Sequence, residues 1–191
     1  MAISLNREQL ILKLKSQLDH ERFHHSLRVE KVALLLAQKH TINKEQTALA
    51  ALLHDYARKF DRPGLLAEAK RRKMKIDPIS RAEPKLLHAE LSARLAREDF
   101  GISNKVILGA IRKHTLGTPK MTTLEKIIFL ADHIEEGRGF TGVQQVRELA
   151  AKDLDRAIAV SLTLTLSHLL KNKLPVHPDS IKTRNYYLLK R

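Results

Sequence analysis

The sequence predicts an all-α protein of one domain, and three observations support this prediction. Apolar residues recur at helical spacings of three and four along most of the chain. No segment alternates apolar and polar residues long enough to predict a β-strand. Aromatic residues make up only 4% and tryptophan is absent, so the core must consist mainly of Leu, Ile, Val and Ala, which suits packed helices. The 191 residues are enough for one domain with its own core.

Cap residues and apolar spacing predict five helices in the first half of the chain. Asn6 and Asn43 suit the N-cap position, and a Gln stands three positions after each, as in a capping box. Proline fits the first turn of a helix, and glycine commonly follows the last. These signals predict helices over 7–18 and 21–39, from 44 through His54, after Pro63, and from Pro84 to about Glu98 with a stop at Gly101.

The second half of the chain is expected to contain further helices. Thr122 followed by Glu125 forms a capping box, which predicts a helix that continues to about Glu135. The other helices are expected over residues 104–114, 143–151 and 154–172, with a short helical stretch between Pro175 and the pair Tyr186–Tyr187.

The residue types present exclude several chemistries. Cysteine is absent, which excludes disulfides, thiolate nucleophiles and cysteine-based zinc fingers. Any metal must therefore be held by imidazole and carboxylate groups, which suit iron, manganese, cobalt, nickel or zinc. The longest apolar runs have six residues, far fewer than the roughly 20 that span a bilayer, and no signal peptide is apparent. We expect a cytoplasmic protein with no membrane partner.

The chain is strongly basic, with 35 Lys and Arg residues against 21 Asp and Glu and a formal net charge of +14. Such a charge favours a polyanionic partner, for example nucleotide phosphates or nucleic acid. The basic run from Lys70 to Lys75 is interpreted as an exposed helix end, since basic side chains favour the last turn of a helix.

Several ionisable residues lie on the apolar faces of the predicted helices. His25, Val29, Val32 and Leu36 are spaced by four, three and four residues, which puts the histidine on the buried face. A single inward histidine is most often a satisfied core residue, and a buried aspartate is costly unless it is paired or binds a metal. Four predicted helices share this pattern, which together indicates a metal centre, and the inward residues are His25, His88, His114 and Asp132.

The adjacent pair His54 and Asp55 adds two further candidate ligands. Neighbours on a helix point about 100° apart, so the two side chains can hold one metal from two sides, or the aspartate can reach a second metal. A bare His-Asp dipeptide is weak evidence, and its weight here comes from the histidines and the aspartate that precede and follow it.

This order of residues resembles the HD-domain superfamily: a His, then His-Asp, then two further His and a distal Asp. Longer stretches resemble the YqeK family within it, and Arg138 and the segment 175–185 are also similar. The resemblance extends from about residue 5 to residue 187, and the stretches that carry it are Arg22–His25, Ala50–Ala57, Leu86–Ala89, Ala110–Gly117 and Leu124–Asp132.

The resemblance implies an activity and a ligand set. The family hydrolyses diadenosine tetraphosphate symmetrically to two ADP and holds two divalent metal ions, usually iron. It implies that His25, His54, Asp55 and Asp132 hold one metal, and that Asp55 bridges to a second held also by His88 and His114. A metal-activated hydroxide would then attack phosphorus. The implied HD phosphohydrolase domain covers 21–172, with an N-terminal helix within 1–20 and a C-terminal tail over 173–191.

Cationic and hydroxyl side chains near these motifs are candidates for contact with the substrate phosphates. We expect His54, Asp55 and Arg58 to act in catalysis, and substrate contacts from Arg22, Arg58, Arg112, Thr115 and Arg138. The chain departs from the usual family pattern with Arg28 for Gly, Arg58 for Lys, Glu90 and Glu136 for Pro, and Thr118 and Lys120 for Arg and Gly. These departures bear on substrate preference more than on hydrolysis.

Two other functions remain open at this point. One is an HD phosphohydrolase that acts on another nucleotide or an alarmone. The other is a basic nucleic-acid-binding or ribosome-associated protein with a structural metal site, although the low aromatic content argues against recognition by base stacking. The glycine pattern at 137–142 follows a predicted helix, so we interpret it as a loop at the mouth of the site that presents Arg138. The stripe Leu162, Leu164 and Leu166 predicts core or a homodimer surface.

Overall fold

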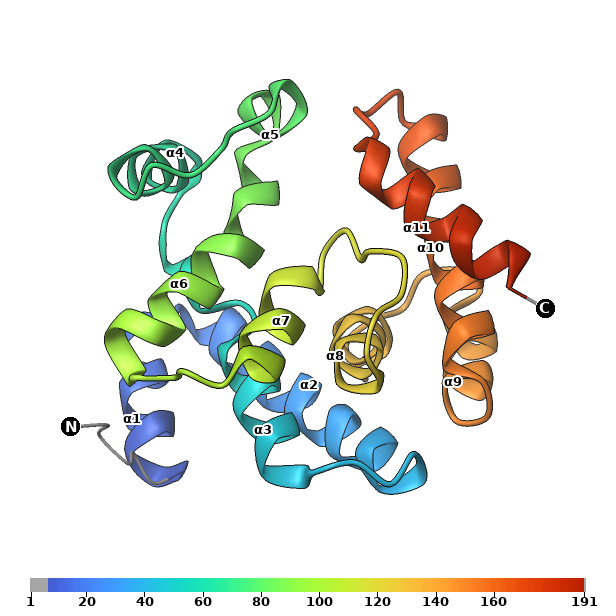
Figure 1. The fold of residues 1–191 in the computed structure, drawn as a ribbon, viewed down its shortest axis with the longest axis horizontal. Helices are drawn as coiled ribbons and strands as arrows, with labels where there is room; N and C mark the ends of the chain where they lie inside the picture. The colour runs from blue at the N-terminus through green and yellow to red at the C-terminus, as the bar shows by residue number, and fades with distance from the viewer. Residues whose placement is uncertain (1–6, 191) are drawn as a thin grey trace.

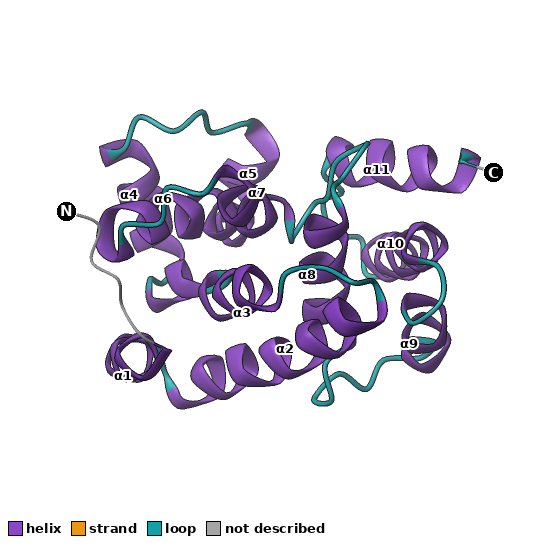
Figure 2. Cartoon of the chain, turned by 60° about the horizontal axis from the view of Figure 1, so that its bottom comes forward, coloured by secondary structure: helices purple, strands orange, loops and turns teal. Residues whose placement is uncertain are grey.

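The computed structural model describes residues 7–190, and within that range the chain forms helices and loops without a β-strand (Figure 2). The predicted all-α fold class is confirmed. The predicted N-cap Asn6 lies outside the described residues. None of the described helices is both long enough and apolar enough to cross a membrane.

The first half of the chain contains a long helix, several shorter ones and two 3-10 turns. These elements are α1 (Arg7–Gln17), α2 (His20–Lys39), α3 (Lys44–Leu53), η1 (Tyr56–Lys59), α4 (Arg62–Arg71), α5 (Pro78–Ala82) and η2 (Pro84–Leu87). The second half is also helical, with α6 (His88–Phe100), α7 (Lys105–Lys113), α8 (Thr123–Ile134), α9 (Val143–Ala150), α10 (Leu154–Lys171) and α11 (Pro178–Leu189).

Most of the predicted caps hold their helices. The Asn43 side chain accepts from the amide of Gln46, and the Thr122–Glu125 capping box is complete in both directions. Gly101 ends α6 with a φ of 68°, a left-handed conformation that glycine adopts without steric cost. The helix boundaries therefore follow from local hydrogen bonding that the sequence already shows.

Three elements differ from the expectation. Helix α5 was not predicted, because its five residues are too few for a spacing pattern; the carboxylate of Asp77 caps it and Pro78 opens it. The helix expected from Pro84 begins as the 3-10 turn η2 and becomes α-helical only at His88. The helical stretch expected before Tyr186–Tyr187 is longer, since α11 includes both tyrosines and packs along α10.

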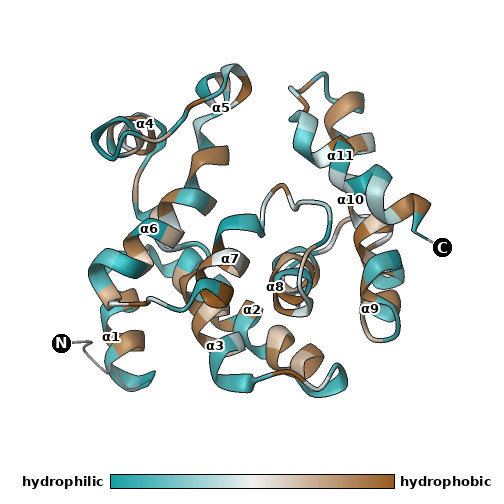
Figure 3. Ribbon diagram, viewed as in Figure 1, coloured by the Kyte–Doolittle hydropathy of each residue, from teal (hydrophilic) through white to brown (hydrophobic). Residues whose placement is uncertain are grey.

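Helix α8 forms the centre of the molecule. It packs against α2, α3 and α7 on one side and against α9 and α10 on the other (Figure 1). Its side chains Ile127, Ile128 and Leu130 are fully buried. Most surface helices are brown on one side and teal on the other in Figure 3, as expected for helices that bury one face. The Asp132 side chain lies in the last turn of α8, close to His25 of α2 and to the residues that end α3 and α7.

Candidate metal centre

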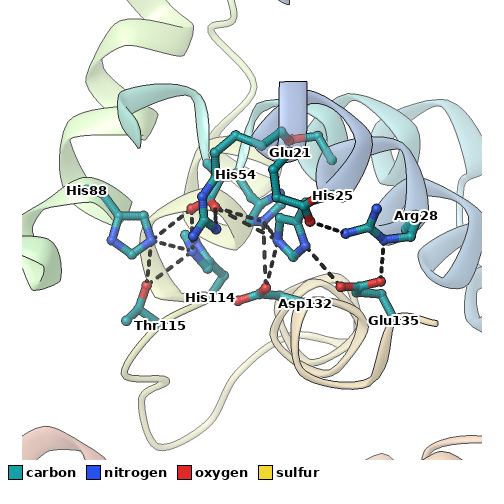
Figure 4. Close-up of polar contacts among 12 residues, drawn as sticks. Glu21, His25, Arg28, His54, His88, His114, Thr115, Asp132 and Glu135 are labelled. Carbon is teal, nitrogen blue, oxygen red and sulfur yellow. Dashed lines mark hydrogen bonds and ion pairs between the residues drawn. The ribbon is translucent and has the colours of Figure 1, made fainter. Parts of the chain in front are cut away.

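Four histidines and two aspartates from different elements meet at one place (Figure 4). The histidines and Asp55 are buried, with at most 8% of their surface exposed, while the Asp132 side chain keeps 23%. The six residues are the ones that the apolar-face pattern and the His-Asp pair singled out: His25, His54, Asp55, His88, His114 and Asp132.

Asp55 stands between two groups of histidines. Its Oδ1 lies 3.0 Å from Nε2 of His88 and 3.8 Å from Nε2 of His114. Its Oδ2 faces the other pair, at 3.8 Å from Nε2 of His25 and 3.9 Å from Nε2 of His54. Asp132 approaches this second pair, with Oδ1 3.0 Å from His25 and 3.9 Å from His54. One carboxylate thus faces both halves of the cluster.

Three of the histidines are oriented by the backbone. The Nδ1 of each makes a hydrogen bond to the carbonyl oxygen three residues before it. His54 donates to Ala51 at 2.6 Å, His114 to Ile111 at 2.7 Å, and His88 to Lys85. Because a carbonyl oxygen only accepts, each Nδ1 must carry the proton. The lone pair is then on Nε2, the atom that faces the cluster.

The helix ends explain why these carbonyls are free. His54 and His114 are the C-cap residues of α3 and α7, where the last carbonyls have no partner within the helix. His88 begins α6 just after η2. Helix α3 ends one residue earlier than expected, at Leu53, and Asp55 leaves the helical conformation, with φ −105° and ψ 13°, just before η1.

Burial sets the charge state of the site. It disfavours the imidazolium form, which lowers the pKa of His54 and lowers that of His114 to about 3. Burial alone would raise the pKa of Asp55, but the surrounding imidazoles His54 and His88 hold it well below its usual range. Neutral imidazoles and ionised carboxylates are the protonation states that bind metals.

The donor set fits divalent metal ions. Three overlapping groups place their ligand atoms within 4.8 Å of one another: His25, His54 and Asp55; His54, His114 and Asp132; and Asp55, His88 and His114. Imidazole nitrogen with carboxylate oxygen is a common donor set for first-row metals. Since four Nε2 atoms and two carboxylates converge here, a cation would satisfy lone pairs that otherwise face each other.

The candidate phosphate contacts fall into two groups. Arg22 donates to Oδ2 of Asp55 at 3.1 Å, and Arg138 donates to Oδ1 of Asp132 at 2.7 Å. The hydroxyl of Thr115 lies 3.2 Å from Nε2 of His88. These three side chains border the cluster, and the loop after α8 carries Arg138 as the sequence suggested.

Arg58 and Arg112 are placed differently. Arg58 is half-buried within the electrostatic range of Asp55 and Arg22, and burial lowers its pKa. Among the described residues its guanidinium has no hydrogen-bond partner. Arg112 instead pairs with Glu90 on the wall of a pocket beside Thr115, so the structure does not bring it to the cluster.

Sequence reasoning missed a buried carboxylate behind the ligands. Glu135 is 2% exposed, and its Oε1 lies 3.2 Å from Nδ1 of His25. Arg28, noted above only as a departure from the family pattern, donates to Oε2 of Glu135 at 2.7 Å. One signal was available: Glu135 follows Asp132 by three residues, the spacing of neighbours on one helix face.

Comparisons with known proteins agree with this geometry. The HD domain family matches residues 22–137. The symmetrical bis(5'-nucleosyl)-tetraphosphatase of Halalkalibacterium halodurans is 40% identical over 97% of this chain and 98% of its own length, and that of Bacillus subtilis is 37% identical over 95% and 97%.

A solved structure shares the fold over nearly the whole chain. A predicted HD superfamily hydrolase from Clostridium acetobutylicum, described as involved in NAD metabolism, is 31% identical with a TM-score of 0.93 and covers 98% of this chain and 99% of its own. The chain therefore belongs to the HD-domain superfamily, and within it to the family of the symmetrical bis(5'-nucleosyl)-tetraphosphatases.

Proposed function

We propose that this protein is a metal-dependent hydrolase that cleaves diadenosine tetraphosphate symmetrically to two ADP. The observation that carries the proposal is the convergence of four histidine Nε2 atoms on Asp55 and Asp132, with Arg22 and Arg138 at the two carboxylates. The relatives named as symmetrical bis(5'-nucleosyl)-tetraphosphatases, which match this chain over nearly its full length, support the choice of substrate.

We propose that the cluster would hold two metal ions, with Asp55 as a ligand to both. His25, His54 and Asp132 would complete one site, and His88 and His114 the other. We propose iron, with manganese, cobalt, nickel and zinc as alternatives that the same donors accept. Bound divalent ions acidify a water molecule and withdraw negative charge from phosphoryl oxygens.

The chain's own residues would position the polyphosphate. Hydrolysis at the central bridge breaks a bond between an inner phosphorus and the bridging oxygen, so the attacked phosphorus stays in one ADP and the other ADP leaves. The four phosphates carry several negative charges. Arg22 is anchored at Asp55 and Arg138 at Asp132, and Arg58 lies within the electrostatic range of both carboxylates. Because these guanidinium groups are partly withdrawn from water, their attraction for phosphoryl oxygens is stronger than at an exposed surface. ADP is a good leaving group, so a strong protein acid is not required.

A pocket beside the cluster offers room for one nucleoside. It has a volume of about 420 Å³ and is lined by Thr115, by Arg112 and Lys113, and by His177 at the start of α11. Thr115 both lines this pocket and lies 3.2 Å from Nε2 of His88, so the pocket borders the metal centre. We propose that one ADP half of the substrate extends into it, which gives Arg112 a role away from the reacting phosphorus.

The test combines metal analysis with product identification. The chain is purified without oxygen, its metal content is measured, and diadenosine tetraphosphate is supplied. We expect bound divalent metal and two ADP per substrate, lost on chelation and in Asp55→Ala. His25→Ala should lose the activity as well. Its matched control is His24→Ala, which should retain activity because His24 is adjacent to a ligand but exposed.

The remaining outcomes decide between the alternatives. Bound metal without ADP release would contradict the proposed substrate and favour another nucleotide or an alarmone, tested with a panel of such compounds. Absence of metal would contradict the proposal and favour the basic nucleic-acid-binding function, whose binding should survive His54→Ala and fall steeply with salt. Homodimer formation and a cytoplasmic location stay predictions.

A further inference from the structure

We infer that Glu135 and Arg28 form a positioning pair that holds His25 in the tautomer needed to bind metal, and that the pair sets the affinity of one metal site only. The inference rests on the proposed function, because it assumes that His25 is a ligand. It assigns a role to two residues that are not among the six proposed metal ligands.

His25 differs from the other three histidines in what its Nδ1 contacts. His54, His88 and His114 each use a backbone carbonyl, while the Nδ1 of His25 contacts the carboxylate of Glu135. His25 lies in the first half of α2, where the preceding carbonyls belong to the helix or its first turn. The side chain of Glu135, the C-cap residue of α8, therefore has to supply the acceptor that backbone carbonyls supply elsewhere.

Glu135 is surrounded by donors, which holds it ionised and fixed. Its Oε2 accepts from Nε of Arg28 at 2.7 Å and from the amide of Gly137 at 2.6 Å. Its Oε1 lies 3.2 Å from Nδ1 of His25 and 3.6 Å from Nε of Arg138, which donates to the carbonyl of Asp132. A Cβ atom at Gly137 would lie 3.0 Å from both carboxylate oxygens, so a glycine lets the backbone come this close. Arg28 is itself tied to Glu21 at 2.8 Å.

The donors around Glu135 dictate the tautomer of His25. An ionised carboxylate only accepts, so Nδ1 of His25 must carry a proton and Nε2 keeps its lone pair toward Asp132 and His54. In Glu135→Gln the amide oxygen is expected to stay on the side of Arg28 and Gly137, since both donate. The amide NH₂ then faces Nδ1 of His25, which must accept, and the ring proton moves to Nε2, where it blocks coordination.

The two metal sites differ in their dependence on this pair. His25 belongs to the group with His54 and Asp55, whereas the group of Asp55, His88 and His114 does not include it. Partners behind a metal-bound histidine typically change metal affinity by about 10- to 100-fold. A loss of metal affinity at only one of the two sites would therefore indicate a positioning role of Glu135 and Arg28, whereas a general loss of structure would lower the affinity of both sites.

The experiment titrates the metal-free full-length chain with Co²⁺ without oxygen, followed by calorimetry and by the visible absorption of the bound ion. In Glu135→Gln we expect the affinity of one site to fall about 10- to 100-fold while the other is unchanged. Arg28→Met should weaken the same site less, since the amide of Gly137 still holds the carboxylate. The matched control is Glu125→Gln, because Glu125 is a buried glutamate in the first turn of α8 that pairs with Lys113. It should leave both sites unchanged.

The outcomes are distinguishable from those of the proposed function. Unchanged affinity in Glu135→Gln, an equal loss at both sites, or the same loss in Glu125→Gln would overturn the positioning role while the hydrolase stands. A wild-type chain that takes up no Co²⁺ would overturn the proposed function and this inference together.

Discussion

The helices around α8 and the helices that follow it bury different kinds of groups. Between α2 and α8 the buried interior includes four histidines and Asp55, gathered where helices end or begin. Between α9 and α11 the described buried side chains are apolar residues such as Ile158 and Leu162, small hydroxyls such as Thr183, and the phenol of Tyr187, with no histidine or carboxylate among them. Both regions are stabilised by apolar packing, but the first also bears the cost of buried ionisable groups. Such a cost is typical of a functional site.

The largest expected effect comes from the same substitution made in each region. His54→Ala should lower turnover of diadenosine tetraphosphate by about a thousandfold or more, because losing several kcal/mol of transition-state stabilisation corresponds to that factor. His168→Ala, on exposed surface of α10, should leave turnover unchanged. Steady-state kinetics of the two variants make the comparison, and a similar loss in both would erase the functional difference between the regions.

Acid should lower the free energy of unfolding of the metal-free protein because of the buried histidines between α2 and α8. Burial lowers the pKa of His114 to about 3 and also lowers that of His54, so the unfolded chain binds protons first as the pH falls. The contribution of these neutral histidines to the free energy of unfolding is fully present above the ordinary histidine pKa of 6.5. It is lost progressively as the pH falls from there toward about 3.

Urea unfolding of the metal-free chain at about pH 7.5 and about pH 5 measures this effect, and we expect a loss of a few kcal/mol. His114→Gln should reduce the slope with pH, while His168→Ala should keep it. A free energy of unfolding that is the same at both pH values would contradict neutral burial of these two histidines.

The smallest expected effect concerns the contribution of the C-terminal helix to the substrate pocket. His177 lies 3.4 Å from Asp77 of the α5 cap and lines the pocket next to Thr115. His177→Ala should raise the KM several-fold, about 1 kcal/mol of binding, with kcat little changed. A fall in kcat with an unchanged KM would instead assign His177 to the chemical step, and an unchanged KM and kcat would leave α11 outside the substrate site.

Local signals in the sequence predicted most helices because caps and apolar spacing act over a few residues. Asn43, Thr122 and Gly101 show this, since each determines a helix end through its own hydrogen bonds or backbone conformation. Helix α5 was missed because five residues carry no spacing pattern. The end of α11 was missed because its packing along α10 is a long-range effect.

The sequence by itself determined the helical class of this protein and the identity of the clustered residues. Apolar spacing shows which side chains each helix buries, and the adjacent His-Asp pair supplied the other two candidates. Only the tertiary structure decided how these residues are used. The direction of each Nε2 depends on which acceptor lies behind the ring, and that acceptor is a carbonyl at three helix ends but Glu135 for His25. Residues 110 apart in sequence make this last contact, and no local pattern encodes it.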